Sequence, residues 1–285
     1  MNKLDSLFEV RRILVAFNPM TPGTALLDTA VDFARHIQAE LDALFVEDTE
    51  LMRLAELPFV HELSLPGGTL KPLDIAEIER EWRARAANMR QALEARAQES
   101  AIRCSFRVVR GRMDTEVRAA ADTADLVMLD RSGGAVTRHA RLKSRWNLPA
   151  TDSPRPVLML RGRHAEIESI IVLYADAGSS KSALGIAAGM SAKLGMDGSP
   201  PQFTVLCFGA TGEGAERAEI GAREILKRQG IGAKFRRVSG TAALLAALDM
   251  PTDALLVSAA SLPGLESDEA ERLVADWQGP VLVVR

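Results

Sequence analysis

The sequence predicts two tandem α/β domains, each a doubly wound, Rossmann-like parallel sheet with strand order 3-2-1-4-5. Three observations predict this fold. Short apolar runs alternate with stretches of helical period, and the same segments recur in the same order later in the chain. The length of 285 residues suits two domains with sizeable cores. Apolar runs without polar alternation are typical of parallel strands covered on both faces, and strand–helix alternation with right-handed crossovers gives a doubly wound sheet.

The elements of the first half follow from their periodicity. The predicted strands are 12–17, 41–46, 102–109, 125–129 and 156–160. Helices are predicted near 24–38, 74–99 and 114–123. The long middle helix has apolar residues at helical spacing, with arginine and glutamate between them: Ile78, Trp82, Met89, Leu93 and Ala97.

The second half repeats these segments. RILVAFN from Arg12 corresponds to SIIVLYAD from Ser169, and the helices that follow align at an offset of 158 residues. FRVVRG at 106–111 corresponds to FRRVSG at 235–240, now at an offset of 129. The closing segments PVLMLR and PVLVVR also correspond. The repeat predicts domains of 1–165 and 166–285, with the boundary at 161–168.

The fall in offset places about 29 extra residues in the first half, between its second and third strands, at 48–77. This insertion is rich in apolar residues: Leu51, Leu54, Leu57, Phe59, Leu63 and Leu65. We expect an insertion of this composition to cover a sheet edge, a pocket or a partner. A packing role and a ligand lid both remain open at this point.

Composition excludes several classes of protein. The net charge of −3 argues against a broad nucleic-acid-binding face. No apolar run approaches the ~18 residues that span a bilayer, and the charged N-terminal dozen lacks a signal-peptide core. Cys104 and Cys207 lie on predicted strands and are expected to be buried thiols in a reducing compartment. We therefore expect a cytoplasmic protein without nucleic-acid or membrane partners.

A ligand of such a sheet binds beyond the carboxyl ends of the strands, where the strand order reverses. With the order 3-2-1-4-5 this point lies between strands one and four of each half. The residues to examine therefore follow Phe17 and Leu129 in the first half and Ala175 and Val257 in the second.

Each half carries an ILVA-type first strand, an Ala-Leu helix start, a DLVML-type fourth strand and a PVLVVR-type closing strand. With these motifs the chain resembles a tandem universal stress protein, and the resemblance covers nearly all of it. It implies a non-enzymatic stress-response or regulatory role. In ATP-binding members, the resemblance implies, an Asp after strand one contacts the nucleoside. Backbone N–H groups of a G-x2-G-x9-G-[ST] loop hold the phosphates.

Neither half keeps the whole motif. The first half has Asn18 in place of the strand-one Asp, and its loop positions read Asp130, Gly133, Lys143 and Ser144. The second half keeps Asp176, followed by Ser179 in the next helix start, but its loop positions read Ser258, Ser261, Glu271 and Arg272. The resemblance therefore implies that ATP is not held by the usual loop, and no cofactor is expected. The candidate ligand-binding residues are Asn18, Gly133, Lys143, Ser144, Asp176 and Ser179.

Other functions remain open. Residues 131–145 contain five cations and no acid, so the first half could hold the phosphates of ATP or AMP through arginine and lysine. The alternative is a solvated loop, or one attracted to the acidic 259–279 segment of the other half. A nucleotide hydrolase on the same sheet is the third reading, although no metal-ligand spacing or nucleophile motif supports it.

Association is expected at two levels. The halves should pack as a pseudo-dimer within the chain, and the closing strand Val281–Val284 is the candidate surface for a homodimer. We also expect a protein partner, whose identity the sequence does not indicate.

Overall fold

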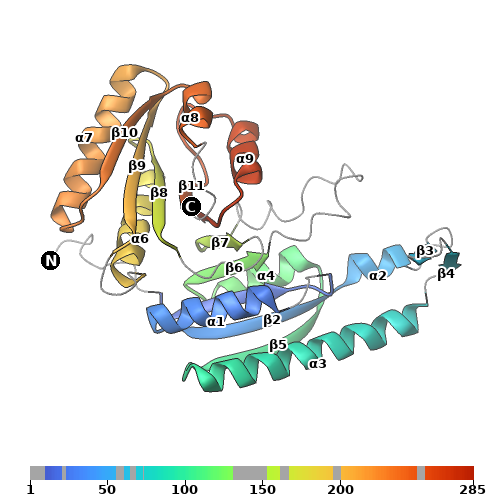
Figure 1. Cartoon of the computed structure of the whole chain (residues 1–285). Coiled ribbons are helices and arrows are strands. Elements are labelled where there is room, and N and C mark those ends of the chain that lie inside the picture. The colour runs from blue at the N-terminus through green and yellow to red at the C-terminus, as the bar shows by residue number, and fades with distance from the viewer. Residues whose placement is uncertain are drawn as a thin grey trace.

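The computed structural model describes residues 10–20, 24–55, 61–64, 69–72, 74–130, 153–160, 167–194, 200–248 and 254–285. Figure 1 shows the two halves side by side, the first in blue to green and the second in yellow to red. The first half consists of β1 (Arg12–Phe17), α1 (Ala25–Ile37), β2 (Glu40–Asp48), α2 (Thr49–Ala55), β3 (His61–Ser64), β4 (Thr69–Pro72), α3 (Ile75–Glu99), β5 (Cys104–Gly111), α4 (Met113–Ala121), β6 (Leu126–Asp130) and β7 (Val157–Leu160).

The second half follows the same plan without the extra elements. It consists of β8 (Ser169–Tyr174), α6 (Gly178–Lys193), β9 (Gln202–Gly209), α7 (Gly212–Arg228), β10 (Lys234–Ser239), α8 (Thr241–Ala247), β11 (Leu255–Ala259), α9 (Ser267–Asp276) and β12 (Val281–Val284). The strands that the sequence predicts in the first half agree with these bounds to within about two residues, the usual scatter of element ends.

Ten of the described strands form one sheet, in the order β10-β9-β8-β11-β12-β7-β6-β1-β2-β5. When the strands of this sheet are numbered along the chain within each half, both halves have the order 3-2-1-4-5. Within each half, every pair of neighbouring strands in this sheet is parallel. The predicted fold class and strand order are therefore confirmed.

The halves meet through their closing strands. β12 pairs antiparallel with β7, with Leu282 opposite Leu158, and it pairs parallel with β11 on its other edge. Both edges of β12 are therefore occupied within the chain. Val281–Val284 therefore has no free edge for pairing with a second chain, and its pairing joins the two halves of one chain instead; a homodimer through another surface stays a prediction.

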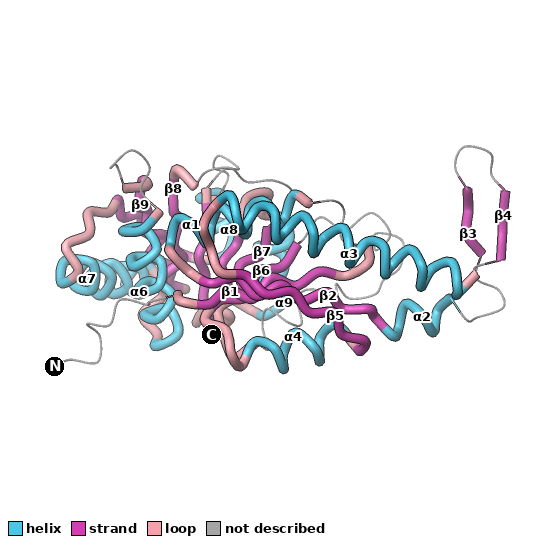
Figure 2. The backbone as a smooth tube through the Cα atoms, turned by 90° about the horizontal axis from the view of Figure 1, so that it is seen from below, coloured by secondary structure: helices cyan, strands magenta, loops and turns pink. Residues whose placement is uncertain are grey.

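Helices cover both faces of the sheet because each buries one apolar stripe. α3 buries residues at helical spacing, namely Trp82, Ala86, Met89, Leu93 and Ala97, so the predicted stripe is confirmed except that Ile78 is only half-buried. Asp74 caps this helix by accepting from the N–H groups of Ala76 and Glu77. Figure 2 shows α3 and α4 on opposite faces of the first half's strands.

The insertion does not extend the main sheet. β3 and β4 pair antiparallel with each other in a separate sheet of two strands. Figures 1 and 2 both place them beyond the ends of α2 and α3, away from the ten-stranded sheet. These strands therefore do not cover an edge of the ten-stranded sheet, which was one of the three roles expected of the insertion, and covering a pocket or a partner stays a prediction. The side chains of the six apolar residues on which that expectation depended lie outside the described ones.

The two ends of the sheet carry exposed arginines. β5 ends it on one side with Arg107 and Arg110, and β10 on the other with Arg236 and Arg237. Charged side chains on an edge strand oppose pairing with the strands of other chains.

The two thiols differ in burial. Cys207 is fully buried, and burial raises the pKa of its thiol to about 12. Cys104 is only half-buried, so the expectation of a buried thiol holds better in the second half. No helix among the described residues is long and apolar enough to cross a bilayer.

Candidate functional site

The crevice of the second half lies where β8 and β11 end side by side. The two strands are parallel neighbours, with Val172 opposite Val257, so their carboxyl ends reach the same edge of the sheet. Asp176 follows β8, and α6 begins two residues later at Gly178. The position that the sequence predicts for the functional site therefore exists, and Asp176 and Ser179 lie at it.

Asp176 has a cationic partner in its own helix. Lys181 Nζ lies 3.3 Å from Asp176 Oδ1, and both side chains are about half exposed. An exposed pair of this kind stabilises the fold by less than about 1 kcal/mol. Its consequence is electrostatic, because the carboxylate that should meet a nucleoside hydroxyl is already neutralised.

Ser179 joins the two sides of the crevice. Its hydroxyl donates to the carbonyl oxygen of Ser261 at 3.4 Å. Ser258 is buried at the end of β11, and its hydroxyl donates to the carbonyl oxygen of Ala259 at 3.0 Å. Ser258 and Ser261 occupy the positions of the first two motif glycines, and there the hydroxyl of Ser258 and the carbonyl oxygen of Ser261 both take part in hydrogen bonds.

Two backbone N–H groups of the turn after β11 already have hydrogen-bond partners. Ala260 N–H donates to the carbonyl of Val284 at 2.7 Å, and Leu265 N–H donates to the carbonyl of Leu262 at 3.1 Å. Leu262 is itself 4% exposed and belongs to the core. The buried Leu262 therefore holds the turn after β11 against the core. A glycine loop that binds an anion instead presents its N–H groups to the ligand.

The helix after this turn has acidic side chains at its start. α9 carries a capping box: Glu266 accepts from the N–H of Glu269, and the Glu269 carboxylate accepts from the N–H of Glu266 at 3.1 Å. The positive end of the helix, which would attract a phosphate, is thus already satisfied by carboxylates. Glu271 and Arg272, at the last motif positions, lie inside α9. The motif is lost because a helix occupies its last positions.

A buried phenol lies beneath Asp176. Tyr174 is fully buried, and within the described part of the chain its hydroxyl has no hydrogen-bond partner. α7 packs closely here, because a Cβ on Gly221 would lie 3.1 Å from the Tyr174 oxygen. Burial, and secondly the negative charge of Asp176, raises the pKa of Tyr174 to about 12.

The phenol gives a direct test of this packing, since Tyr174 is the single tyrosine of the chain. In the folded protein we expect its phenolate absorbance to appear near pH 12, against about 10 in urea-unfolded protein. Because folding raises this pKa, the stabilisation is complete below pH 10 and is lost as the pH rises through 12. Asp176→Asn should lower the folded midpoint. A folded midpoint equal to the unfolded one would contradict the packing.

The crevice of the first half is described only in part. Asn18 follows β1 and accepts from the N–H of Met20 at 2.8 Å. Arg85 of α3 donates to the carbonyl oxygen of Pro19, which fixes this turn against the long helix. Asp130 ends the neighbouring strand β6 and is 8% exposed. Gly133, Lys143 and Ser144 lie outside the described residues, so their predicted roles stay predictions.

Sequence reasoning missed the groups that fill the second crevice. Lys181 was visible as a cation in the first turn of the helix after Asp176, and Leu262 as an apolar residue among loop positions. The Glu266–Glu269 spacing matches the acidic half of a capping box. Among the described residues no group of histidine, cysteine, aspartate or glutamate is placed to hold a metal ion.

No protein-family model and no curated protein matches the sequence. Solved structures are similar over almost the whole chain. A universal stress protein from Archaeoglobus fulgidus DSM 4304 has a TM-score of 0.70 at 15% identity, covering 97% of this chain and 96% of that one. A functionally unknown protein from Pseudomonas aeruginosa PAO1 has a TM-score of 0.61 at 17% identity, covering 98% and 94%. The chain thus has the fold of a tandem universal stress protein.

Proposed function

We propose that the protein is a non-enzymatic, cytoplasmic regulatory protein of the universal stress type, with domains of 1–165 and 166–285. Its second half does not hold ATP by a glycine loop. The observation that carries this proposal is the start of α9, where Glu266 and Glu269 form an acidic capping box and place two carboxylates where a phosphate would have to bind. The similar fold over both halves supports the regulatory role.

Electrostatics favours this reading over nucleotide binding in the second half. A phosphate placed at the turn after β11 would meet two carboxylates of α9 instead of free N–H groups. Like charges at a helix N-terminus repel, and the Ser179 and Leu262 contacts would have to break first. A protein of this kind transmits its signal through its surface and its partners, and not through turnover.

A titration calorimetry experiment with ATP and AMP tests this proposal on the full chain. We expect no heat that depends on the second half, so Asp176→Asn and Ser179→Ala should leave any signal unchanged. A signal that either substitution removes would contradict the proposal. Release of ADP or pyrophosphate after prolonged incubation would contradict the non-enzymatic assignment and support the hydrolase reading.

The second candidate is ATP or AMP binding by the first half. It is favoured by the run of five cations and no acid at 131–145, directly after β6. Arginine and lysine would then replace backbone N–H groups at the phosphates. We expect nucleotide heat that is lost with Lys143→Ala or Ser144→Ala and retained with Ser179→Ala. Absence of heat at millimolar nucleotide removes this candidate.

A further inference from the structure

The helix and strand next to the sheet edge can be aligned between the halves residue by residue. β5 and β10 align at an offset of 129, which places Val108 on Arg237. The same offset places the buried residues of α3 on buried residues of α7: Ala86, Met89, Leu93 and Ala97 on Ala215, Ala218, Ala222 and Leu226. Equivalent positions of the two halves can therefore be compared side chain by side chain.

In the second half, a network of charged side chains fills the space between α7 and the edge strand β10. Arg237 of β10 forms ion pairs with Glu219 and, at 3.2 Å, with Glu216. Arg223 pairs with Glu219 at 2.6 Å and lies over the ring of Phe235, 4.2 Å from its centre. Two cations and two anions thus balance one another between α7 and the edge strand.

In the first half two of these four charges are missing. Val108 stands in place of Arg237, and Ala87 stands in place of Glu216. Both replacements are small, and a hollow of about 280 Å³ opens there between α3 and the strands β2 and β5. Val108 lies in its lining and is 41% exposed.

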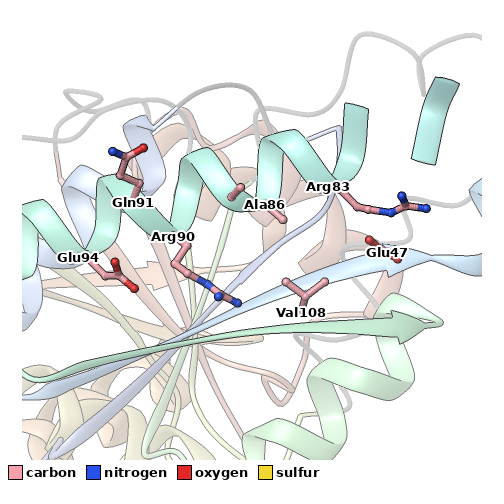
Figure 3. Close-up of a pocket in the computed structure, with 8 residues that line it drawn as sticks. Glu47, Arg83, Ala86, Arg90, Gln91, Glu94 and Val108 are labelled. Atoms are coloured by element: carbon pink, nitrogen blue, oxygen red, sulfur yellow. The ribbon is translucent and has the colours of Figure 1, made fainter. Parts of the chain in front are cut away.

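The two remaining charges have exchanged signs. Arg90 stands in place of Glu219, and Glu94 in place of Arg223. Arg90 lies over Phe106, 5.3 Å from the ring centre, so a cation is still stacked on the ring although it comes from the other of the two helix positions. Within the described part of the chain, Arg90 and Glu94 form no ion pair. Figure 3 shows Arg90 extended toward the strands, with Glu94 and Glu47 toward the two ends of the hollow.

We infer that this hollow is a binding site for a small zwitterion of the α-amino-acid class. The carboxylate of the ligand binds Arg90, its ammonium group binds Glu94, and its aliphatic part lies on Ala87 and Val108. A simple anion would leave Glu94 unpaired, and a simple cation would leave Arg90 unpaired. A molecule with both charges gives Arg90 and Glu94 each a partner, while the other two charges of the lining, Glu47 and Arg83, are of opposite sign. The volume is at the small end for ligand sites, which suits an amino acid better than a nucleotide.

The test uses the full chain labelled for NMR, with glycine, leucine, glutamate and lysine as free amino acids. We expect one or more of them to shift the amide resonances of Arg90 and Val108, with a dissociation constant on the order of 1 mM. The same compounds as N-acetyl amides, which have lost both backbone charges, should shift them at least about tenfold more weakly, the ratio that one good charged contact gives.

Filling the hollow gives the decisive variant. Ala87→Glu with Val108→Arg installs the side chains of the second half and should abolish the shifts. The matched control places the same two side chains on exposed positions of α8, as Leu245→Arg with Ala246→Glu, and should bind like the unmodified chain. Arg90→Ala keeps the hollow open and should still weaken binding about tenfold or more. This variant therefore tests the inference even if the filled variant misfolds.

Three results would overturn the inference. The first is that none of the four amino acids causes a shift at about 20 mM, well above the expected dissociation constant. The second is that the filled variant binds as well as its control. The third is that the N-acetyl amides bind as tightly as the free amino acids, since apolar contact alone would then account for the site. None of these results bears on nucleotide binding, which concerns other residues.

Discussion

Leu158→Asp is expected to lower the free energy of unfolding by about 4 kcal/mol, because it buries a carboxylate with no partner. Leu158 of β7 lies opposite Leu282 of β12, and neither side chain is more than 1% exposed. The carboxylate must either stay charged among apolar side chains or force the two closing strands apart. Urea denaturation followed by far-ultraviolet circular dichroism measures the loss.

The matched control is Leu245→Asp. Leu245 lies on α8 and is 51% exposed, so this substitution should change the free energy of unfolding by no more than about 0.5 kcal/mol. Equal urea midpoints for the two variants would show that β7 and β12 do not pair in solution. A selective effect at Leu158 would establish the pairing as the joint between the halves.

Gly209→Ala is expected to be the next most damaging change, with a loss of about 3 kcal/mol. Gly209 ends β9, and a Cβ there would lie far inside contact distance of the backbone of Gly214 and Ala215. The obstacle is backbone, so no side chain can move aside, and α7 would have to shift as a unit. Thermal denaturation should show the loss as a clear fall in the melting temperature.

Gly212→Ala serves as its control three residues later. Gly212 is the first residue of α7, and nothing lies within 4 Å of a Cβ built there. Alanine favours the helix more than glycine does, so this variant should be as stable as the unmodified chain or gain up to about 1 kcal/mol. If both variants melted alike, the close approach of α7 to β9 would be refuted.

The repeat explains why the fold could be predicted so fully from the sequence. Apolar runs such as 12–17 become strands buried on both faces, and the offsets of matching segments locate the insertion and the second domain. Periodicity says nothing about which chain a closing strand pairs with. β12 pairs with β7 of the same chain, and sequence alone does not give this geometry.

The site was predictable in position and less so in chemistry. From the sequence we could place Asp176 and Ser179 at the crevice and see that the motif glycines are missing. It did not indicate that Lys181 neutralises Asp176, or that Glu266 and Glu269 cap α9, because these contacts depend on side-chain direction. The hollow beside Val108 was missed as well, although the aligned pair Val108 and Arg237 was present in the repeat from the start.

The antiparallel pairing of β7 with β12 also determines whether one ligand molecule can bind both crevices at once. β1 and β8 are separated by β6, β7, β12 and β11, so the axes of these two strands lie about 24 Å apart at ~4.8 Å per strand, before twist is added. Strand direction reverses at the joint, and the two crevices therefore open in different directions. A small ligand seated in one cannot chelate across to the other, so avidity between the crevices is excluded and each must recognise its ligand alone.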